Sequence, residues 1–230
     1  MEVKTLAVGG LGTNCYILIE GDQCVVIDPG DEGDRILKAL AVDGERANLL
    51  GVQAILLTHA HFDHTLAARY LQEKTGAPVF VGSKDKAMLS DPGWMKQFMP
   101  SDVAAPADIR TLGEGDQVAL GGATLEVWET PGHSPGSLTF VLDAVLGSAP
   151  AVAGATTAPL SAPSHSPKMV FCGDLIFRRG VGRTDLPGGD PDQLFNSVDR
   201  VLSLAGKTNI YPGHGPSTTV GSEKAANPFL

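Results

Sequence analysis

The chain has 230 residues, of which 43% are hydrophobic and 19% charged, a composition typical of a globular protein with a sizeable core. Its 26 acidic residues outnumber its 17 basic ones, and the resulting net charge of −9 disfavours a nucleic-acid-binding protein, because phosphate contacts need Lys and Arg. No segment has the roughly 18 uncharged apolar residues that span a bilayer, so we expect no membrane helix.

The N-terminal segment and the cysteines indicate a compartment. MEVKTLAVGG has no basic head followed by an apolar run, so no secretory signal is expected. Cys15, Cys24 and Cys172 are an odd number without close spacing, which disfavours a disulfide framework. We therefore expect a cytoplasmic protein, and the sequence carries no signal for its oligomeric state.

The first half of the chain alternates predicted strands and helices. Two apolar runs at 14–20 and 23–28, separated by Gly21-Asp22, predict a β-hairpin. Apolar spacing and Gly or Pro punctuation predict the next elements. In chain order these are a helix at 33–42, a buried strand at 53–57, a helix at 65–74 ending at Gly76, and a strand at 78–81.

The second half continues in the same manner, with one interruption. The predicted elements are strands at 123–129, 137–142 and 169–172, a helix at 192–204 and a strand at 208–211. Residues 143–168 contain 15 Ala, Pro or Ser among 26 residues and show no periodicity, so we expect a flexible insertion within a single domain, 1–230. His165 lies inside it and is expected to be an exposed loop histidine.

Three of the six histidines fall in the stretch THAHFDH at 58–64, directly after the predicted strand 53–57. His133 in TPGHSPGS, Asp174 in FCGDLIF and His214 in YPGHGP also follow apparent strands, each directly after a glycine. Glycine and proline mark tight turns, which can fix the direction of a side chain. Strand ends are common positions for functional sites in layered α/β domains.

These loops supply seven nitrogen and oxygen donors, which exceed the three or four protein ligands that one Zn²⁺ usually takes. They fit two adjacent metal sites that share a carboxylate better than one crowded site. Fe and Mn²⁺ also accept such a donor set. The alternative, structural histidines and solvated acids, explains any single residue more easily than all of them together. The donors are His59, His61, Asp63, His64, His133, Asp174 and His214.

The pattern H-x-H-x-D-H at 59–64, followed by His133, Asp174 and His214 and preceded by Asp28 in VIDPG, resembles the metallo-β-lactamase superfamily. The resemblance covers nearly the whole chain. It implies an α/β fold, the αββα sandwich, with two divalent metal ions at one edge between the sheets. It also implies that Asp28 orients ligands from behind, although a turn-forming Asp before Pro-Gly is an equal alternative. The implied ligands are His59, His61 and His133 for the first ion, Asp63, His64 and His214 for the second, and Asp174 between them.

Further motifs resemble one branch of that superfamily. VGRTDLPGGD at 181–190, YPGHGPST at 211–218 and NPFL at 227–230 are similar to glyoxalase II-like hydrolases, particularly short bacterial members without the C-terminal helical domain. True β-lactamases of this fold generally lack the bridging aspartate, so Asp174 disfavours antibiotic hydrolysis. The nuclease branch usually carries a large added domain.

The reaction that this resemblance implies is hydrolysis of a small-molecule thioester, such as S-D-lactoylglutathione, by a hydroxide shared between the two ions. Asp63 would orient the hydroxide and Asp174 would bridge the ions. Arg183 is the candidate substrate contact, because a guanidinium can clasp a carboxylate; an ion pair with Asp185 or Asp190 is the alternative. Cys172 is expected to be a core residue.

Three other functions match parts of the pattern. Persulfide dioxygenases share the fold and the H-x-H-x-D-H motif but use one iron, which would be held here by His59, His133 and Asp174. Their last histidine motif resembles Y-P-A-H-D, whereas this chain has YPGHGP. A non-catalytic module would be expected to lack ligands, and an electron-transfer protein of this fold would carry an added flavin domain. The thioester hydrolase is therefore favoured.

Overall fold

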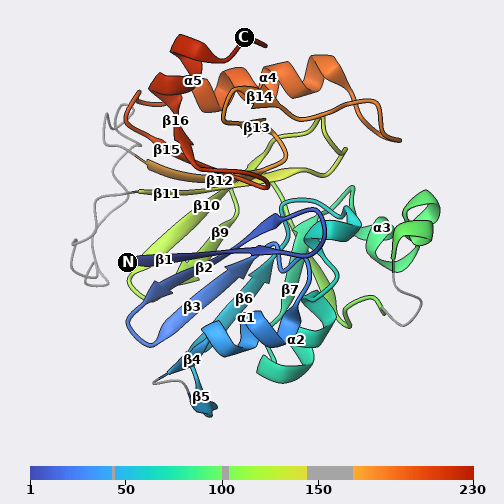
Figure 1. Cartoon of the computed structure of the whole chain (residues 1–230), viewed down its shortest axis with the longest axis vertical. Helices are drawn as coiled ribbons and strands as arrows, with labels where there is room; N and C mark the ends of the chain where they lie inside the picture. Colours follow the sequence, from blue (N-terminus) through green and yellow to red (C-terminus); the bar gives the residue numbers. More distant parts are fainter. Residues whose placement is uncertain (43–44, 100–103, 144–167) are drawn as a thin grey trace, which may run out of the picture.

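Two six-stranded sheets stack against each other in the computed structural model, which describes residues 1–42, 45–99, 104–143 and 168–230 (Figure 1). The first sheet, in spatial order, contains β1 (Glu2–Val8), β2 (Thr13–Glu20), β3 (Gln23–Ile27), β6 (Gly51–Leu56), β7 (Val79–Gly82) and β8 (Ile109–Leu112). The second contains β16 (Thr218–Thr219), β15 (Asn209–Pro212), β12 (Lys168–Gly173), β11 (Leu138–Asp143), β10 (Ala123–Glu129) and β9 (Gln117–Leu120).

Helices cover the outer face of each sheet (Figure 1). The α-helices are α1 (Gly33–Ala39), α2 (Ala68–Thr75), α3 (Lys86–Ser90), α4 (Pro191–Leu202) and α5 (Val220–Ala226). The 3-10 helices are η1 (Phe62–His64) and η2 (Gly93–Phe98), and two small ribbons pair β4 (Ala41–Val42) with β5 (Glu45–Leu49) and β13 (Ile176–Phe177) with β14 (Gly180–Val181). None of the helices in the described ranges is long and apolar enough to cross a membrane.

In the described part of the chain, three buried apolar clusters lie between the layers. Strand β2 shows why, because successive side chains point to opposite faces of a sheet. Ile17 belongs to the cluster under α1 and α2, whereas Leu18 belongs to the cluster between the two sheets. A third cluster joins the second sheet to α4 through residues such as Val198. The layer order is therefore helix, sheet, sheet, helix, and the predicted αββα sandwich is confirmed.

The predicted hairpin and the predicted strands at 53–57, 78–81, 123–129, 137–142, 169–172 and 208–211 are confirmed, with small shifts at their ends. The helix predicted at 33–42 is too long: it ends at Ala39, and Ala41–Val42 pairs with β5 instead. The helix predicted at 65–74 begins only at Ala68, because residues 62–64 form the 3-10 turn η1. It ends as predicted, with Gly76 in the left-handed conformation that favours glycine.

The strands bring the donor-bearing loops to one edge of the sandwich. β10 and β12 are both antiparallel to β11, and β15 is parallel to β12, so the carboxyl ends of all three point the same way. The end of β6 in the other sheet meets them there, since the Leu138 backbone N–H donates to the Thr58 carbonyl oxygen at 2.7 Å. His133, Asp174 and His214 are therefore carried to the loop that holds His59.

The Ala/Pro/Ser-rich insertion lies between paired strands. Asp143 ends β11 and Lys168 begins β12; they are cross-strand neighbours, with their side chains 2.7 Å apart. Residues 144–167, including His165, lie outside the described residues. Because the flanking residues already pair, replacing 145–166 by a two-residue turn is expected to leave the metal content per chain unchanged, as is His165→Ala. Elemental analysis of both variants checks this, and an unfolded or metal-poor deletion protein would contradict it.

Candidate metal centre

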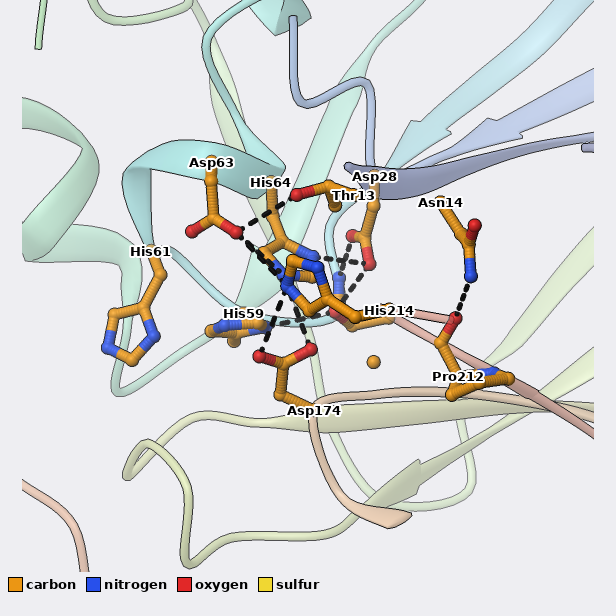
Figure 2. A network of polar contacts seen from close by, with 12 residues as sticks. Thr13, Asn14, Asp28, His59, His61, Asp63, His64, Asp174, Pro212 and His214 are labelled. Carbon is orange, nitrogen blue, oxygen red and sulfur yellow. Dashed lines mark hydrogen bonds and ion pairs between the residues drawn. The ribbon is translucent and has the colours of Figure 1, made fainter. Parts of the chain in front are cut away.

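The predicted donors converge on one site at the edge between the sheets, and Figure 2 labels all of them except His133. Within each of three overlapping groups, the potential ligand atoms all lie within 4.8 Å of one another. These groups are His59, His61 and His133; His59, His64 and Asp174; and Asp63, His64 and His214. The first group is the predicted set for one ion and the third is the set for the other, while the middle group joins them. The sequence prediction thus identified the residues that lie together.

Hydrogen bonds at Nδ1 fix the orientation of the imidazole rings of His133 and His214. His133 Nδ1 lies 2.8 Å from the Arg183 carbonyl oxygen, and His214 Nδ1 lies 3.2 Å from that of Leu11. A carbonyl oxygen can only accept, so each Nδ1 must carry the proton. In the neutral ring the Nε2 lone pair is then available to a metal ion.

Asp28 orients the two most buried histidines through a short chain of hydrogen bonds. Its Oδ2 lies 2.9 Å from His64 Nδ1 and accepts from the Thr58 hydroxyl at 2.7 Å, while its Oδ1 accepts from the Thr58 backbone N–H at 2.7 Å. Because that hydroxyl donates to Asp28, it can accept from His59 Nδ1, 3.1 Å away. Asp28 is therefore more than a turn residue: it holds His64 directly and His59 through Thr58.

Several buried atoms at the centre fit a metal ion. His59 Nε2, His64 Nε2 and Asp174 Oδ1 have no hydrogen-bond partner among the described residues. Such atoms are costly to bury unless something compensates for their lost hydration. Imidazole nitrogens and carboxylate oxygens aimed at one another suit a divalent cation.

The two carboxylates lie between the imidazoles. Asp174 Oδ1 is 3.4 Å from His64 Nε2, and its Oδ2 is 3.5 Å from His214 Nε2 and 3.7 Å from His133 Nε2. Asp63 Oδ2 is 3.2 Å from His214 Nε2 and accepts from the Thr13 hydroxyl at 2.9 Å. Asp174 therefore contacts residues of both predicted ligand sets, whereas Asp63 contacts only the second.

A family model described as "Metallo-beta-lactamase superfamily" matches residues 8–144, more than half of the chain. The chain belongs to the metallo-β-lactamase superfamily. Among curated relatives of this superfamily member, the "Probable metallo-hydrolase YqgX" of Bacillus subtilis is 37% identical, with 100% of this chain and 98% of that protein covered. The "Hydroxyacylglutathione hydrolase GloC" of Haemophilus influenzae is 31% identical, with 100% and 98% covered.

Solved structures of the superfamily are similar over the whole chain. The B3 metallo-β-lactamase BLEG-1 has a TM-score of 0.79 at 31% identity, with 100% of this chain and 99% of that one covered. A di-iron form of TTHA1623 has a TM-score of 0.76 at 38% identity, covering 99% and 100%. ETHE1 from Myxococcus xanthus has a TM-score of 0.69 at 27% identity, covering 99% and 84%. The donor cluster of this chain fits a dinuclear metal centre, and the similar protein TTHA1623 was solved with two irons bound.

Four histidines of the two ligand sets, His59 and His61 in the first and His64 and His214 in the second, differ in their affinity for protons. Burial and neighbouring imidazoles lower the pKa of His59, and they lower that of His61 to about 4. Burial alone would also lower the pKa of His64 and His214, but the adjacent carboxylates outweigh it and raise both. Burial opposes ionisation of Asp63, yet the hydrogen bond from His214 and the nearby His64 hold its pKa below the usual range.

These opposite shifts predict the order in which acid removes the ions. At about pH 6 His61 stays neutral, whereas His64 and His214 hold protons that an ion must displace. We therefore expect the second ion to dissociate first as the pH falls, and the first to persist to lower pH. Metal content measured by equilibrium dialysis against buffers of decreasing pH checks this. Loss of both ions over the same pH range would contradict it.

The side chain of Arg183 forms the ion pair with Asp185 that the sequence analysis gave as the alternative to substrate binding. It is 61% exposed and donates two hydrogen bonds of 2.7 Å to the carboxylate of Asp185. Its backbone carbonyl is the group that orients His133. The sequence interpretation missed this second role, and it missed Thr13 and Thr58. Only Thr58 had a local signal, since it is the polar residue between a buried strand and the histidine cluster.

Proposed function

We propose that this chain is a dinuclear metal-dependent thioester hydrolase whose substrate is S-D-lactoylglutathione or a similar hydroxyacyl thioester. The observation that carries the dinuclear part is Asp174, whose two oxygens face His64, His214 and His133 across both ligand sets. The substrate class rests on the full-length similarity to GloC, whose name describes a hydroxyacylglutathione hydrolase, and on the sequence motifs at 181–190 and 211–218.

Two divalent ions bound here would supply a water of lowered pKa as nucleophile and a Lewis acid for the thioester carbonyl. The chain itself orients the reactants. Asp63 stays ionised, is held by the Thr13 hydroxyl, and can accept a hydrogen bond from the attacking water. Asp174, whose pKa is also lowered by the surrounding histidines despite its burial, keeps a negative charge between the two sets.

Among the described residues, no cysteine at the centre is available as a covalent nucleophile. Cys172, two residues before Asp174, is 2% exposed and packs in the cluster beneath α4, which confirms its predicted place in the core. Burial raises the pKa of its thiol to about 12, so the reactive thiolate is scarce at neutral pH. Among the residues that the structure describes, the centre therefore favours a water nucleophile.

The first test is hydrolysis of S-D-lactoylglutathione by protein reconstituted with Zn²⁺ or Mn²⁺, followed by absorbance of the thioester. We expect metal-dependent turnover that a chelator abolishes. Turnover of a β-lactam alone would instead support the activity for which the metallo-β-lactamase BLEG-1 is named. Loading with one iron per chain, with oxygen uptake on glutathione persulfide, would support the dioxygenase alternative.

Arg183 is proposed to bind a substrate carboxylate, which would replace Asp185 on the guanidinium. Arg183→Ala is expected to raise KM for S-D-lactoylglutathione several-fold with little change in kcat, since the side chain contacts no metal ligand. Steady-state kinetics check this. Arg110→Ala is the matched control, because Arg110 forms a similarly exposed pair with Asp108, on and beside β8. An unchanged KM in Arg183→Ala would remove Arg183 from the site.

A further inference from the structure

Asp85 is a fully buried carboxylate that the proposed chemistry does not use. It stands at the N-terminal end of the short helix α3, where an aspartate commonly accepts a hydrogen bond from the first turn of its own helix. The Asp85 side chain makes no such bond. Its two oxygens are directed instead at two loops distant in sequence.

Both loops carry ligands of the first ion. Asp85 Oδ2 accepts from the Ala60 backbone N–H at 3.1 Å and from the Ser134 hydroxyl at 2.6 Å. Its Oδ1 accepts from the Gly136 backbone N–H at 2.7 Å. Ala60 lies between His59 and His61, and Ser134 directly follows His133. One carboxylate thus ties together the backbone around all three predicted ligands of the first ion.

The chemistry of these contacts requires a group that only accepts. Two of the three partners are backbone N–H groups, and the third is a hydroxyl that donates to the carboxylate. An ionised carboxylate satisfies all three, whereas an asparagine amide would place its own N–H atoms against at least one donor. Because the site is buried, a donor left unpaired there could not turn to solvent, and the loop would have to move.

The packing around Asp85 leaves no room for the loop to move in this way. A Cβ on Gly136 would lie 2.5 Å from the Asp85 backbone nitrogen and 2.7 Å from its Oδ1. A Cβ on Gly82 would lie 1.9 Å from the Gly136 carbonyl oxygen. Glycine at position 136 therefore permits this backbone to approach the Asp85 carboxylate, and glycine at position 82 permits the two segments to pack tightly against each other.

We propose that Asp85 is a positioning residue for the first metal ion, which sets the spacing of His59 and His61 relative to His133 and thereby the affinity of that ion. The second ligand set is held by other residues, since Asp28 contacts His64 and Thr13 contacts Asp63. The inference goes beyond the proposed function, because metal affinity can be measured without any substrate.

The test separates the two ions by removing one site at a time. In a His214→Ala background, which leaves the first site, Asp85→Asn is expected to weaken Zn²⁺ binding about 10- to 100-fold. In a His61→Ala background, which leaves the second site, the same substitution is expected to leave Zn²⁺ affinity unchanged. Competition with a chromophoric chelator gives both affinities, and circular dichroism with Tm verifies the fold.

Glu223→Gln is the matched control, since Glu223 is also a buried carboxylate and accepts from the Arg179 and Asn227 nitrogens and the Thr218 hydroxyl. It should leave the affinity of the first site unchanged. Should Asp85→Asn not fold, Ser134→Ala removes one donor and is expected to give a smaller, equally selective loss. Equal losses at both sites in the folded variant, or an unchanged first site, would overturn the proposal.

Discussion

Asp174→Ala is expected to lose at least one metal ion per chain and, with it, hydrolytic turnover. The carboxylate is the residue whose oxygens approach histidines of both ligand sets, at 3.4 Å for His64 and 3.7 Å for His133. Alanine would remove the negative charge that faces three imidazoles and that would lie between the two bound cations. The mutual repulsion of the cations would then be uncompensated. Elemental analysis after reconstitution and gel filtration measures the loss.

Asp143→Ala is the control for this experiment, because Asp143 is an exposed aspartate at the end of β11 that pairs with Lys168 outside the centre. It should retain the wild-type metal content. If Asp174→Ala bound as much metal as the wild type, the assignment of Asp174 as the shared ligand would be wrong.

Gly213→Ala is expected to weaken metal binding almost as much as Asp174→Ala, although it adds only one methyl group. A Cβ at this position would lie 2.1 Å from Asp174 Oδ1 and 2.7 Å from His64 Cε1. The backbone cannot move aside easily, because the Gly213 N–H donates to the Gly173 carbonyl at 2.8 Å and its own carbonyl accepts from the Asn14 N–H at 2.7 Å. Asp174 and His64 must therefore shift, and we expect metal affinity to fall about 10- to 100-fold.

Gly215→Ala provides the comparison. Gly215 has a φ of 73°, and no atom of the described residues lies within 4 Å of an added Cβ, so this substitution tests backbone strain without intrusion into the centre. It is expected to lower the free energy of unfolding by ~1 kcal/mol and to leave the metal affinity unchanged. Equal metal affinities for the two alanine variants, measured by chelator competition, would show that the contact at Gly213 has no bearing on the ions.

Local patterns in the sequence were sufficient to predict most of the central strands. Strand β10 was predicted with its observed bounds at 123–129, and the end of α2 followed from Gly76. The helix predicted at 33–42 was too long because Ala41–Val42 pairs with β5, an interaction between segments that helical spacing cannot register. The short elements β13, β14 and β16 have only two residues each, too few to show any period.

The metal-ligand donors could be predicted because they too are marked by local patterns in the sequence. His59, His61, Asp63 and His64 lie in one short stretch, and His133, Asp174 and His214 each follow a glycine after a strand. Among the residues that orient them, Asp28 was named by the resemblance and Thr58 adjoins the histidine cluster, but Asp85 and Thr13 have no such mark. Asp85 is 25 residues from Ala60 and 49 from Ser134, and Thr13 is 50 from Asp63, so their contacts arise only when the sheets are assembled.

The most direct test of the dinuclear centre is the number of ions that the wild-type protein binds. Metal-free protein should be titrated with Zn²⁺ against a chromophoric chelator, with elemental analysis of the saturated sample. Two ions per chain at saturation are expected, because two sets of donors and the shared Asp174 lie together in the structure. Saturation at a single ion would contradict the dinuclear centre and favour a mononuclear enzyme of the same fold.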